Sequence, residues 1–198
     1  MSPLRTLAVL LLVVAAPAAA QLGHSDAYNF LQAVREGKNM EVLAALNKPG
    51  SQVVNTRDIS TGEGALHIVA KQGNAQYLNF LLSRGADPNL RDGRNNTPLM
   101  VAVESGHGEL VPLLIAGRAN PNLANASGET PLIRAVQRRD LALVRTLIAS
   151  KADPDRRDNI AGLSARDYAA RDTRNPALSK LFADLPKQTR APVAGPKL

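Results

Sequence analysis

Asn95-Asn96-Thr97-Pro98-Leu99 opens the segment that best reveals the architecture of this 198-residue chain, and Arg118-Ala119-Asn120-Pro121-Asn122 closes it. The pattern of this segment recurs 33 residues upstream and 33 residues downstream. The same spacing relates Leu66, Leu99 and Leu132, and also the pairs Leu81-Leu82, Leu114-Ile115 and Leu147-Ile148. Self-similarity at a fixed period of this size indicates a stacked array, in which each unit buries its apolar side against its neighbours.

The ends of the repeating segment carry helix and turn signals. Thr97-Pro98-Leu99 and Thr130-Pro131-Leu132 each place a threonine where its hydroxyl can cap a helix, and a proline at the first helical position. Gly64-Ala65-Leu66-His67 is a degraded form of the same helix start. The connecting turns repeat as Gly85-Ala86-Asp87-Pro88-Asn89 and Lys151-Ala152-Asp153-Pro154-Asp155. This pattern resembles the ankyrin repeat family, and the resemblance implies an all-α solenoid of stacked helix-turn-helix units, about four to five including degenerate caps.

The resemblance divides the repeat domain, residues 21–186, into five units. Their approximate ranges are 25–57, 58–91, 92–124, 125–157 and 158–186. In the first unit Ser25 is a plausible helix cap, with Asp26 in the first turn and Gly37 ending the helix. The first unit carries a three-residue insertion and the fifth one extra residue, as expected of terminal units that meet water on one side.

Both ends of the chain lie outside the repeats. Residues 1–20 combine Arg5, the uncharged apolar run 7–16 and the small residues Pro17-Ala18-Ala19-Ala20. This sequence predicts a secretory signal peptide cleaved after Ala20, and hence an exported bacterial protein that is periplasmic or secreted. The alternative is an uncleaved anchor; no other segment has the length of a membrane helix. Residues 187–198 are basic and predicted to be a disordered tail.

Unit four departs most from the family pattern. The family usually has glycine at the end of the first helix and again before the Ala-Asp turn, both favouring left-handed backbone. Unit two keeps both glycines, as Gly73 and Gly85, and unit three keeps Gly106 but has Arg118. Unit four has Arg139 and Lys151 instead. Each such replacement costs about 1 kcal/mol, so local opening is expected to start in the C-terminal half. Pro112 would bend the second helix of unit three if it lay past the first turn.

Few residues suggest chemistry. The chain has no cysteine and only three histidines, and His67 and His107 occupy repeat positions rather than a metal-ligand cluster. In the family the histidine at the place of His67 hydrogen-bonds the neighbouring turn. Aspartates recur at equivalent turn positions, where bonding to their own backbone is the simplest explanation: Asp87, Asp92, Asp153 and Asp158. We expect no enzyme activity, no cofactor and no metal site; an enzyme with an unrecognised site is the remaining alternative.

The chain is basic, with 24 Lys and Arg against 17 Asp and Glu. Ten basic residues and six aspartates lie between Arg134 and Arg174. A solvated face of mixed charge is the simplest interpretation, and an acidic protein surface is the favoured functional one. Tyr168 is the one aromatic residue of this segment, so a set of stacking residues is missing and nucleic acid is not expected. A binder of anionic polymer or of a membrane surface through this half remains an alternative.

The family resemblance also implies a binding surface. In ankyrin-like arrays the turn tips and the exposed side of the first helix line a concave groove. The corresponding residues here are Ile59, Ser60, Glu63, Lys71, Gln72, Gly93, Arg94, Asn96, Glu104, Ser105, Ala126, Ser127, Glu129, Gln137 and Arg138. This polar set predicts recognition of a protein partner by a monomer. A helper or inhibitor of an envelope protein would fit; binding through the caps or the tail is the alternative.

Overall fold

A computed structural model describes residues 25–186, which contain ten α-helices, two short 3₁₀ turns and no β-strand. The order along the chain is α1 (Asp26–Glu36), α2 (Asn39–Asn47), η1 (Val53–Asn55), α3 (Ala65–Gln72), α4 (Ala75–Ser83), α5 (Pro98–Ser105), η2 (Gly108–Leu110), α6 (Val111–Ala116), α7 (Pro131–Gln137), α8 (Leu141–Ala149), α9 (Ala165–Arg171) and α10 (Pro176–Ala183). The predicted all-α solenoid is confirmed.

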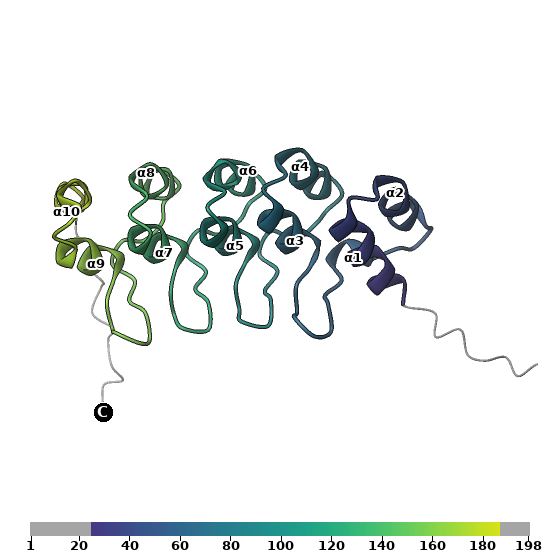
Figure 1. The fold of residues 1–198 in the computed structure, drawn as a ribbon, viewed down its shortest axis with the longest axis horizontal. Helices are drawn as coiled ribbons and strands as arrows, with labels where there is room; N and C mark the ends of the chain where they lie inside the picture. Colours follow the sequence, from purple (N-terminus) through teal and green to yellow (C-terminus); the bar gives the residue numbers. More distant parts are fainter. Residues whose placement is uncertain (1–24, 187–198) are drawn as a thin grey trace, which may run out of the picture.

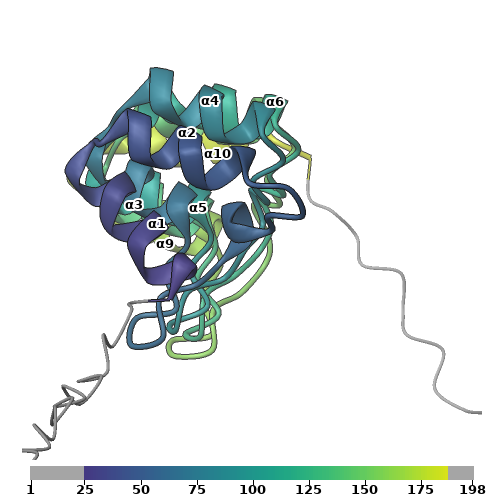
Figure 2. The same cartoon turned by 90° about the vertical axis from the view of Figure 1, so that its right-hand side faces the viewer.

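The helices form two parallel rows (Figure 1). The inner row is α1, α3, α5, α7 and α9, and the outer row is α2, α4, α6, α8 and α10. Consecutive inner helices pack directly against each other, and each outer helix packs on the inner helix of its own unit. The connecting turns all project away from the outer row, and an end-on view shows them stacked one behind another (Figure 2).

One apolar core runs through the array from Phe30 in α1 to Phe182 in α10. Leu66, Leu99 and Leu132 occupy the second position of successive inner helices and are all buried. The outer helices contribute the buried series Leu81, Leu114 and Leu147. Burial of one such side chain stabilises the fold by about 1.5–3 kcal/mol, so the repeated leucines account for the period seen in the sequence.

The helix starts are as the sequence predicts. The Ser25 hydroxyl accepts a hydrogen bond from the Tyr28 amide at 3.2 Å. Thr97 accepts from the Met100 amide and Thr130 from the Ile133 amide, both at 3.3 Å. Pro98 and Pro131 begin their helices, where no backbone donor is lost. Gly37, Gly73 and Gly106 end α1, α3 and α5 in the left-handed conformation.

The departures of units three and four have structural consequences. Arg118, Arg139 and Lys151 adopt the left-handed conformation with φ of 70°, 58° and 64°, as expected from their places in the repeat. Asn95, with φ 61°, is a further example that the sequence comparison of the units missed. Pro112 lies in the first turn of α6, directly after η2. It therefore costs no helical hydrogen bond and does not bend the helix.

The predicted signal peptide 1–20, His24 and the predicted tail 187–198 fall outside the described residues. Between residues 25 and 186, no helix has both the length and the apolar character required to traverse a bilayer.

Candidate protein-interaction surface

Three asparagines tie each turn to the next. The side-chain amide nitrogens of Asn55, Asn89 and Asn122 donate to the carbonyl oxygens of Gly85, Arg118 and Lys151, each at 3.1 Å. Their side-chain oxygens accept from the backbone amides of Asp87, Asn120 and Asp153 at 2.6–2.7 Å. We call these contacts the asparagine bridges. Because each side chain pairs two backbone groups of the following unit, the bridges fix the spacing of the turns.

The tips of the turns are joined as well. The amides of Gly93, Ala126 and Asn159 donate to the carbonyl oxygens of Thr61, Arg94 and Ser127, at 2.8–2.9 Å. Space at these contacts is short, since a Cβ atom on Gly62 would lie 2.5 Å from the Gly93 nitrogen. Backbone bonds between successive tips therefore make a continuous edge along the array.

Acidic and amide side chains hold each turn in shape. Asp92 Oδ1 accepts from the amides of Arg94 and Asn96, both at 2.8 Å. Asp158 does the same for Ile160, Ala161 and Gly162, and Asp87 and Asp153 bond the amide two residues later. The prediction that these aspartates serve turn chemistry is confirmed.

Hydrogen bonds and a guanidinium group stabilise the ionised carboxylate of Asp58, the residue that begins its turn. The Ser60 hydroxyl, the Arg35 guanidinium and two backbone amides hold the pKa of Asp58 well below its usual range. At Asp158 burial alone would raise the pKa, but the Tyr168 hydroxyl and three backbone amides lower it. Both carboxylates are therefore ionised in the folded protein at neutral pH.

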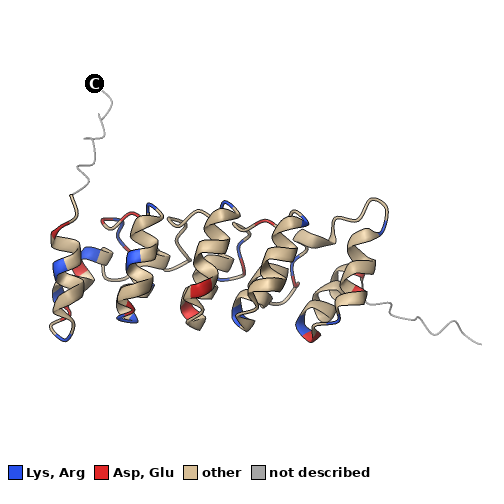
Figure 3. Ribbon diagram, turned by 90° about the horizontal axis from the view of Figure 1, so that it is seen from above, with Lys and Arg blue, Asp and Glu red and all other residues tan. Residues whose placement is uncertain are grey.

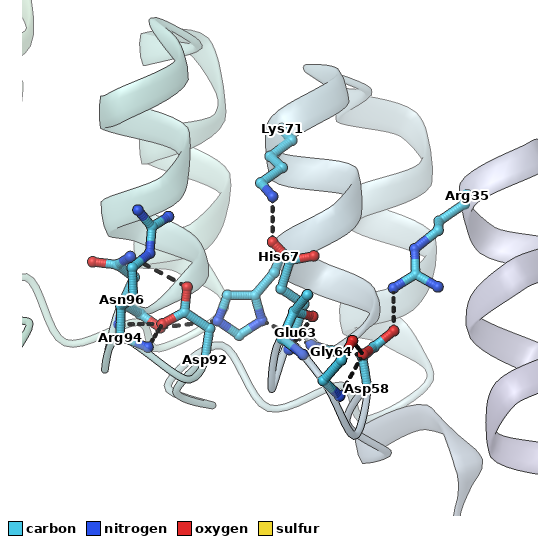
Figure 4. Close-up of polar contacts among 11 residues, drawn as sticks. Arg35, Asp58, Glu63, Gly64, His67, Lys71, Asp92, Arg94 and Asn96 are labelled. Carbon is cyan, nitrogen blue, oxygen red and sulfur yellow. Dashed lines mark hydrogen bonds and ion pairs between the residues drawn. The ribbon is translucent and has the colours of Figure 1, made fainter.

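His67 joins two units (Figure 4). Its Nδ1 accepts from the Gly64 amide at 3.1 Å, so Nε2 carries the proton and donates to the Asn96 carbonyl oxygen at 3.0 Å. The imidazole is buried, and burial lowers its pKa. The predicted bond to the neighbouring turn is confirmed. His107 is also structural, since its Nε2 lies 3.1 Å from the Lys71 carbonyl oxygen and its ring covers Gly73.

The structure places most of the predicted binding residues at the surface. Those that are exposed are Ile59, Ser60, Lys71, Gln72, Gly93, Arg94, Ser105, Ala126, Gln137 and Arg138; Glu104, Ser127 and Glu129 are partly exposed. We call these thirteen residues the recognition surface. They come from the turn tips and from the C-terminal ends of α3, α5 and α7, so three successive units contribute equivalent positions.

Two of the predicted residues are not available to a partner. Asn96 is only 2% exposed, and its amide nitrogen donates to Asp92 Oδ2 at 3.2 Å. Glu63 is also buried, and its carboxylate pairs with Lys71 (Figure 4). The expectation that these two residues lie on the exposed face is therefore wrong: both brace the turn against the inner helix.

Further ion pairs hold the recognition surface in place. Arg35 of α1 lies 2.6 Å from Asp58 in the following turn (Figure 4). Arg134 of α7 contacts Glu129 at 2.8 Å and Glu104 at 3.3 Å, and so joins units three and four. These pairs are partly exposed and contribute little each, but together they orient the side chains of the surface.

Four of the ten basic residues between Arg134 and Arg174, Arg134 among them, form ion pairs within the described residues. Arg139, Arg157 and Arg166 contact Asp172, Asp167 and Asp155 at 2.6, 3.4 and 2.7 Å. Seen from the outer row, the broad helix faces carry little charge, and the coloured residues lie mainly at helix ends and in the connections (Figure 3). A continuous basic face is therefore not formed by the outer helices.

Sequence reasoning missed several parts of the surface. Ile160 is 77% exposed at the last turn tip, and the carried-over set omitted it because that set ended at unit four. A hollow of about 240 Å³ lies beside Tyr28 and Ile59, and one of about 400 Å³ lies between α7 and α9. Within residues 25–186, no group of three or more His, Asp or Glu is placed to hold a metal ion.

Comparisons with known proteins agree with this geometry. A family model described as ankyrin repeats (3 copies) matches residues 18–124 and 66–158. The chain is similar to human oxysterol-binding protein-related protein 1, with 42% identity over 72 residues, which is 36% of this chain and 8% of that protein. It is 44% identical over 52 residues to the nuclear factor NF-kappa-B p110 subunit of Drosophila melanogaster, covering 26% and 5% of the two chains.

A viral protein is matched over a larger share of its own length. The chain is 37% identical over 78 residues to putative ankyrin repeat protein FPV230 of Fowlpox virus (strain NVSL), which is 38% of this chain and 40% of the viral protein. The matches thus span less than half of each of these three relatives.

Proposed function

The chain belongs to the ankyrin repeat family, and on that premise we propose that it is a non-catalytic protein that binds a protein partner along the recognition surface. One observation carries the proposal: the scaffold under this surface is fixed, whereas much of the surface itself is not used for packing. The asparagine bridges, the tip-to-tip backbone bonds and His67 set the spacing of the units. Because the backbone of such a surface is already in place, binding costs less conformational entropy than it would on a flexible surface.

We further propose that the protein acts outside the cytoplasm as a monomer. The basis for the location is the sequence of residues 1–20, which has the charged start, apolar run and small-residue end of a secretory signal. We propose that the partner is an envelope protein and that this chain acts as its helper or inhibitor. Fractionation of cells expressing the full chain, with the mature N-terminus sequenced, tests the export and the cleavage after Ala20.

The absence of cysteine permits a direct test of the surface. Single-cysteine variants at Ile59, Ser105 and Gln137 would carry a photoactivatable crosslinker on the recognition surface. Matched variants at Asn79 of α4 and Arg145 of α8 would carry it on exposed positions of the outer row. We expect the same partner to be crosslinked from the first three positions and not from the last two. Crosslinks from the outer row alone would refute the proposal.

Charge reversal and salt separate this function from the polyanion alternative. Arg94→Glu should weaken the crosslinked complex while the melting temperature stays close to that of the unaltered chain. Arg138→Glu should weaken it as well, but also removes a bond to the Glu104 carbonyl oxygen and should lower the melting temperature slightly. Binding to an anionic polymer would fall steeply between low and moderate salt, whereas recognition of a protein surface should persist. Complexes that vanish at moderate salt would favour the alternative.

A further inference from the structure

The hollow between α7 and α9 stands at the end of the recognition surface. It encloses about 400 Å³, and its walls come from the C-terminal ends of both inner helices and from the turn after α9. The lining residues are Val136, Gln137, Arg139, Tyr168, Arg171, Asp172, Thr173 and Arg174. Gln137 belongs to the recognition surface, so the hollow is continuous with it.

Positive charge predominates in this hollow. Three guanidinium groups, from Arg139, Arg171 and Arg174, share it with one carboxylate, from Asp172. Arg139 contacts that carboxylate through two nitrogens, at 2.6 and 3.5 Å, and the Arg174 backbone amide bonds it at 3.0 Å. The hydrogen bond from Arg139 lowers the pKa of Asp172, which therefore stays ionised and engaged.

The other two guanidinium groups lack such a partner. Arg171 and Arg174 are exposed, and neither forms an ion pair with a residue in the part of the chain that the structure describes. Elsewhere along the inner row the basic side chains Arg35, Lys71 and Arg134 are each paired with a carboxylate. Arg94 and Arg138 of the recognition surface also form no ion pair among the described residues, but neither lines the hollow, where two such guanidinium groups lie together.

We infer that this hollow receives a carboxylate-bearing acidic segment of the protein partner, with Arg171 and Arg174 as the contacting groups. The inference rests on the proposed function and specifies the chemistry of the partner at one end of the surface. Guanidinium groups bind carboxylates through parallel N–H donors, which gives both strength and direction. Gln137 and Thr173 supply neutral polar groups in the same wall.

The neighbouring charges favour an acidic peptide over a nucleic acid. Glu104 and Glu129, in units three and four, lie on the recognition surface, and Glu129 accepts from Gln137 of the hollow at 3.3 Å. A polyanion that continued along the surface would meet these carboxylates, whereas a peptide needs its acidic residues only where the hollow is. The Tyr168 hydroxyl donates to Asp158 at 2.6 Å, which orients the one aromatic ring of the wall.

Three probes test the inference with the full chain. The first is a fluorescent peptide of glutamates spaced by glycine and serine, the second is its glutamine counterpart, and the third is an oligothymidylate. Amide chemical shifts of the ¹⁵N-labelled protein would locate binding, and fluorescence anisotropy would measure affinity. The test variant is Arg171→Gln/Arg174→Gln. The matched control, Arg145→Gln/Lys180→Gln, removes the same charge from exposed positions on α8 and α10.

We expect the glutamate peptide to shift the amides of Gln137, Arg171, Thr173 and Arg174, and the glutamine peptide to shift none of them. Affinity should fall about fivefold in the test variant and less than about twofold in the control. Shifts confined to other residues, or equal losses in both variants, would overturn the inference. Oligothymidylate binding at the same amides with equal affinity would overturn it in favour of a polyanion.

The shift map of the unaltered protein decides the question even if the double variant fails to fold. A glutamate peptide that does not shift the amides of the hollow would refute this inference. If Ser105 and Gln137 still crosslink the partner, the proposed function would stand. Crosslinks from the outer row alone would instead refute the proposed function.

Discussion

The Asn89 side-chain amide donates to the Arg118 carbonyl oxygen, 3.1 Å away in the following unit. Arg118 is one of the non-glycine residues held in the left-handed conformation, with φ 70°. The same asparagine accepts from the Asn120 amide at 2.7 Å. The side chain thus satisfies the carbonyl oxygen of the strained Arg118 and the amide two residues later, and stabilises a turn that glycine would adopt without cost.

Removal of this bridge should destabilise the fold. Asn89→Ala leaves the Arg118 carbonyl and the Asn120 amide without protein partners, and we expect a loss of about 1–2 kcal/mol. Urea unfolding followed by circular dichroism would measure it. Asn79→Ala, at an exposed position of α4, is the matched control and should be neutral or slightly stabilising. Equal effects at both positions would contradict the role of the bridge.

A second substitution at the same site separates the donor from the acceptor. Asn89→Asp keeps an acceptor for the Asn120 amide but provides no donor for the Arg118 carbonyl oxygen. We expect a free energy of unfolding between those of the unaltered chain and Asn89→Ala. A variant as stable as the unaltered chain would show that the donated bond contributes nothing.

Glycine should be stabilising at Lys151. Its φ of 64° costs a non-glycine residue about 1 kcal/mol, and Lys151→Gly removes this cost while the carbonyl bond from Asn122 is kept. We expect a gain of about 0.5–1 kcal/mol. Lys180→Gly, inside α10, should lose about 1 kcal/mol. Thermal unfolding of both variants measures the contrast, and a loss in both would show that the backbone at Lys151 is not strained.

His67 should make stability depend on pH. Burial lowers its pKa in the folded protein, so the unfolded chain takes up a proton near pH 6.5 while the folded one stays neutral. The contribution of the neutral His67 imidazole to the free energy of unfolding is complete above pH 6.5 and is lost as the pH falls below that value. The pKa values of Asp58 and Asp158 are lowered from 3.8, so these groups titrate only in stronger acid.

The test compares urea unfolding at pH 7.5, 6 and 5 in the unaltered chain and in His67→Gln. We expect the substituted chain to be less stable at pH 7.5 and to lose less stability on acidification. Parallel curves for the two proteins would show that His67 does not carry the pH dependence.

Local opening should begin in the C-terminal half. The left-handed residues Arg139 and Lys151 lie at either end of α8, and within residues 25–186 no asparagine bridge follows that of Asn122. Amide hydrogen exchange of the native protein should therefore be faster in α7 and α8 than in α3 and α4. Earlier exchange in α3 and α4 would contradict this order.

The architecture could be predicted from the sequence alone, because the residues that repeat at a fixed period are those that form the core. Leu66, Leu99 and Leu132 recur every 33 positions and all three lie in the core. Thr97 and Thr130 indicate helix starts because each caps its helix with a bond to the amide three residues later, which does not depend on the rest of the fold. The strain at Arg139 and Lys151 could likewise be predicted by comparing units position by position.

The surface was less predictable, since exposure depends on contacts between units. Asn96 and Glu63 occupy positions that the family resemblance predicts to be exposed. Asn96 is instead buried by its hydrogen bond to Asp92, and Glu63 by its ion pair with Lys71. The hollow beside Arg171 requires two inner helices to be placed side by side, which residue spacing does not supply. The partner roles of the remaining residues are still predictions.

Asp155 occupies the place that Asn122 has one unit earlier, and it forms an ion pair with Arg166 of unit five at 2.7 Å. Because a carboxylate cannot donate, Asp155 cannot provide the donated bond of an asparagine bridge to the following unit. A longer version of this protein should therefore be built by duplicating an internal segment such as 92–124, where both junctions present asparagine. Unit five nevertheless packs on unit four through α7 and α9, so stacking does not require an asparagine at every junction.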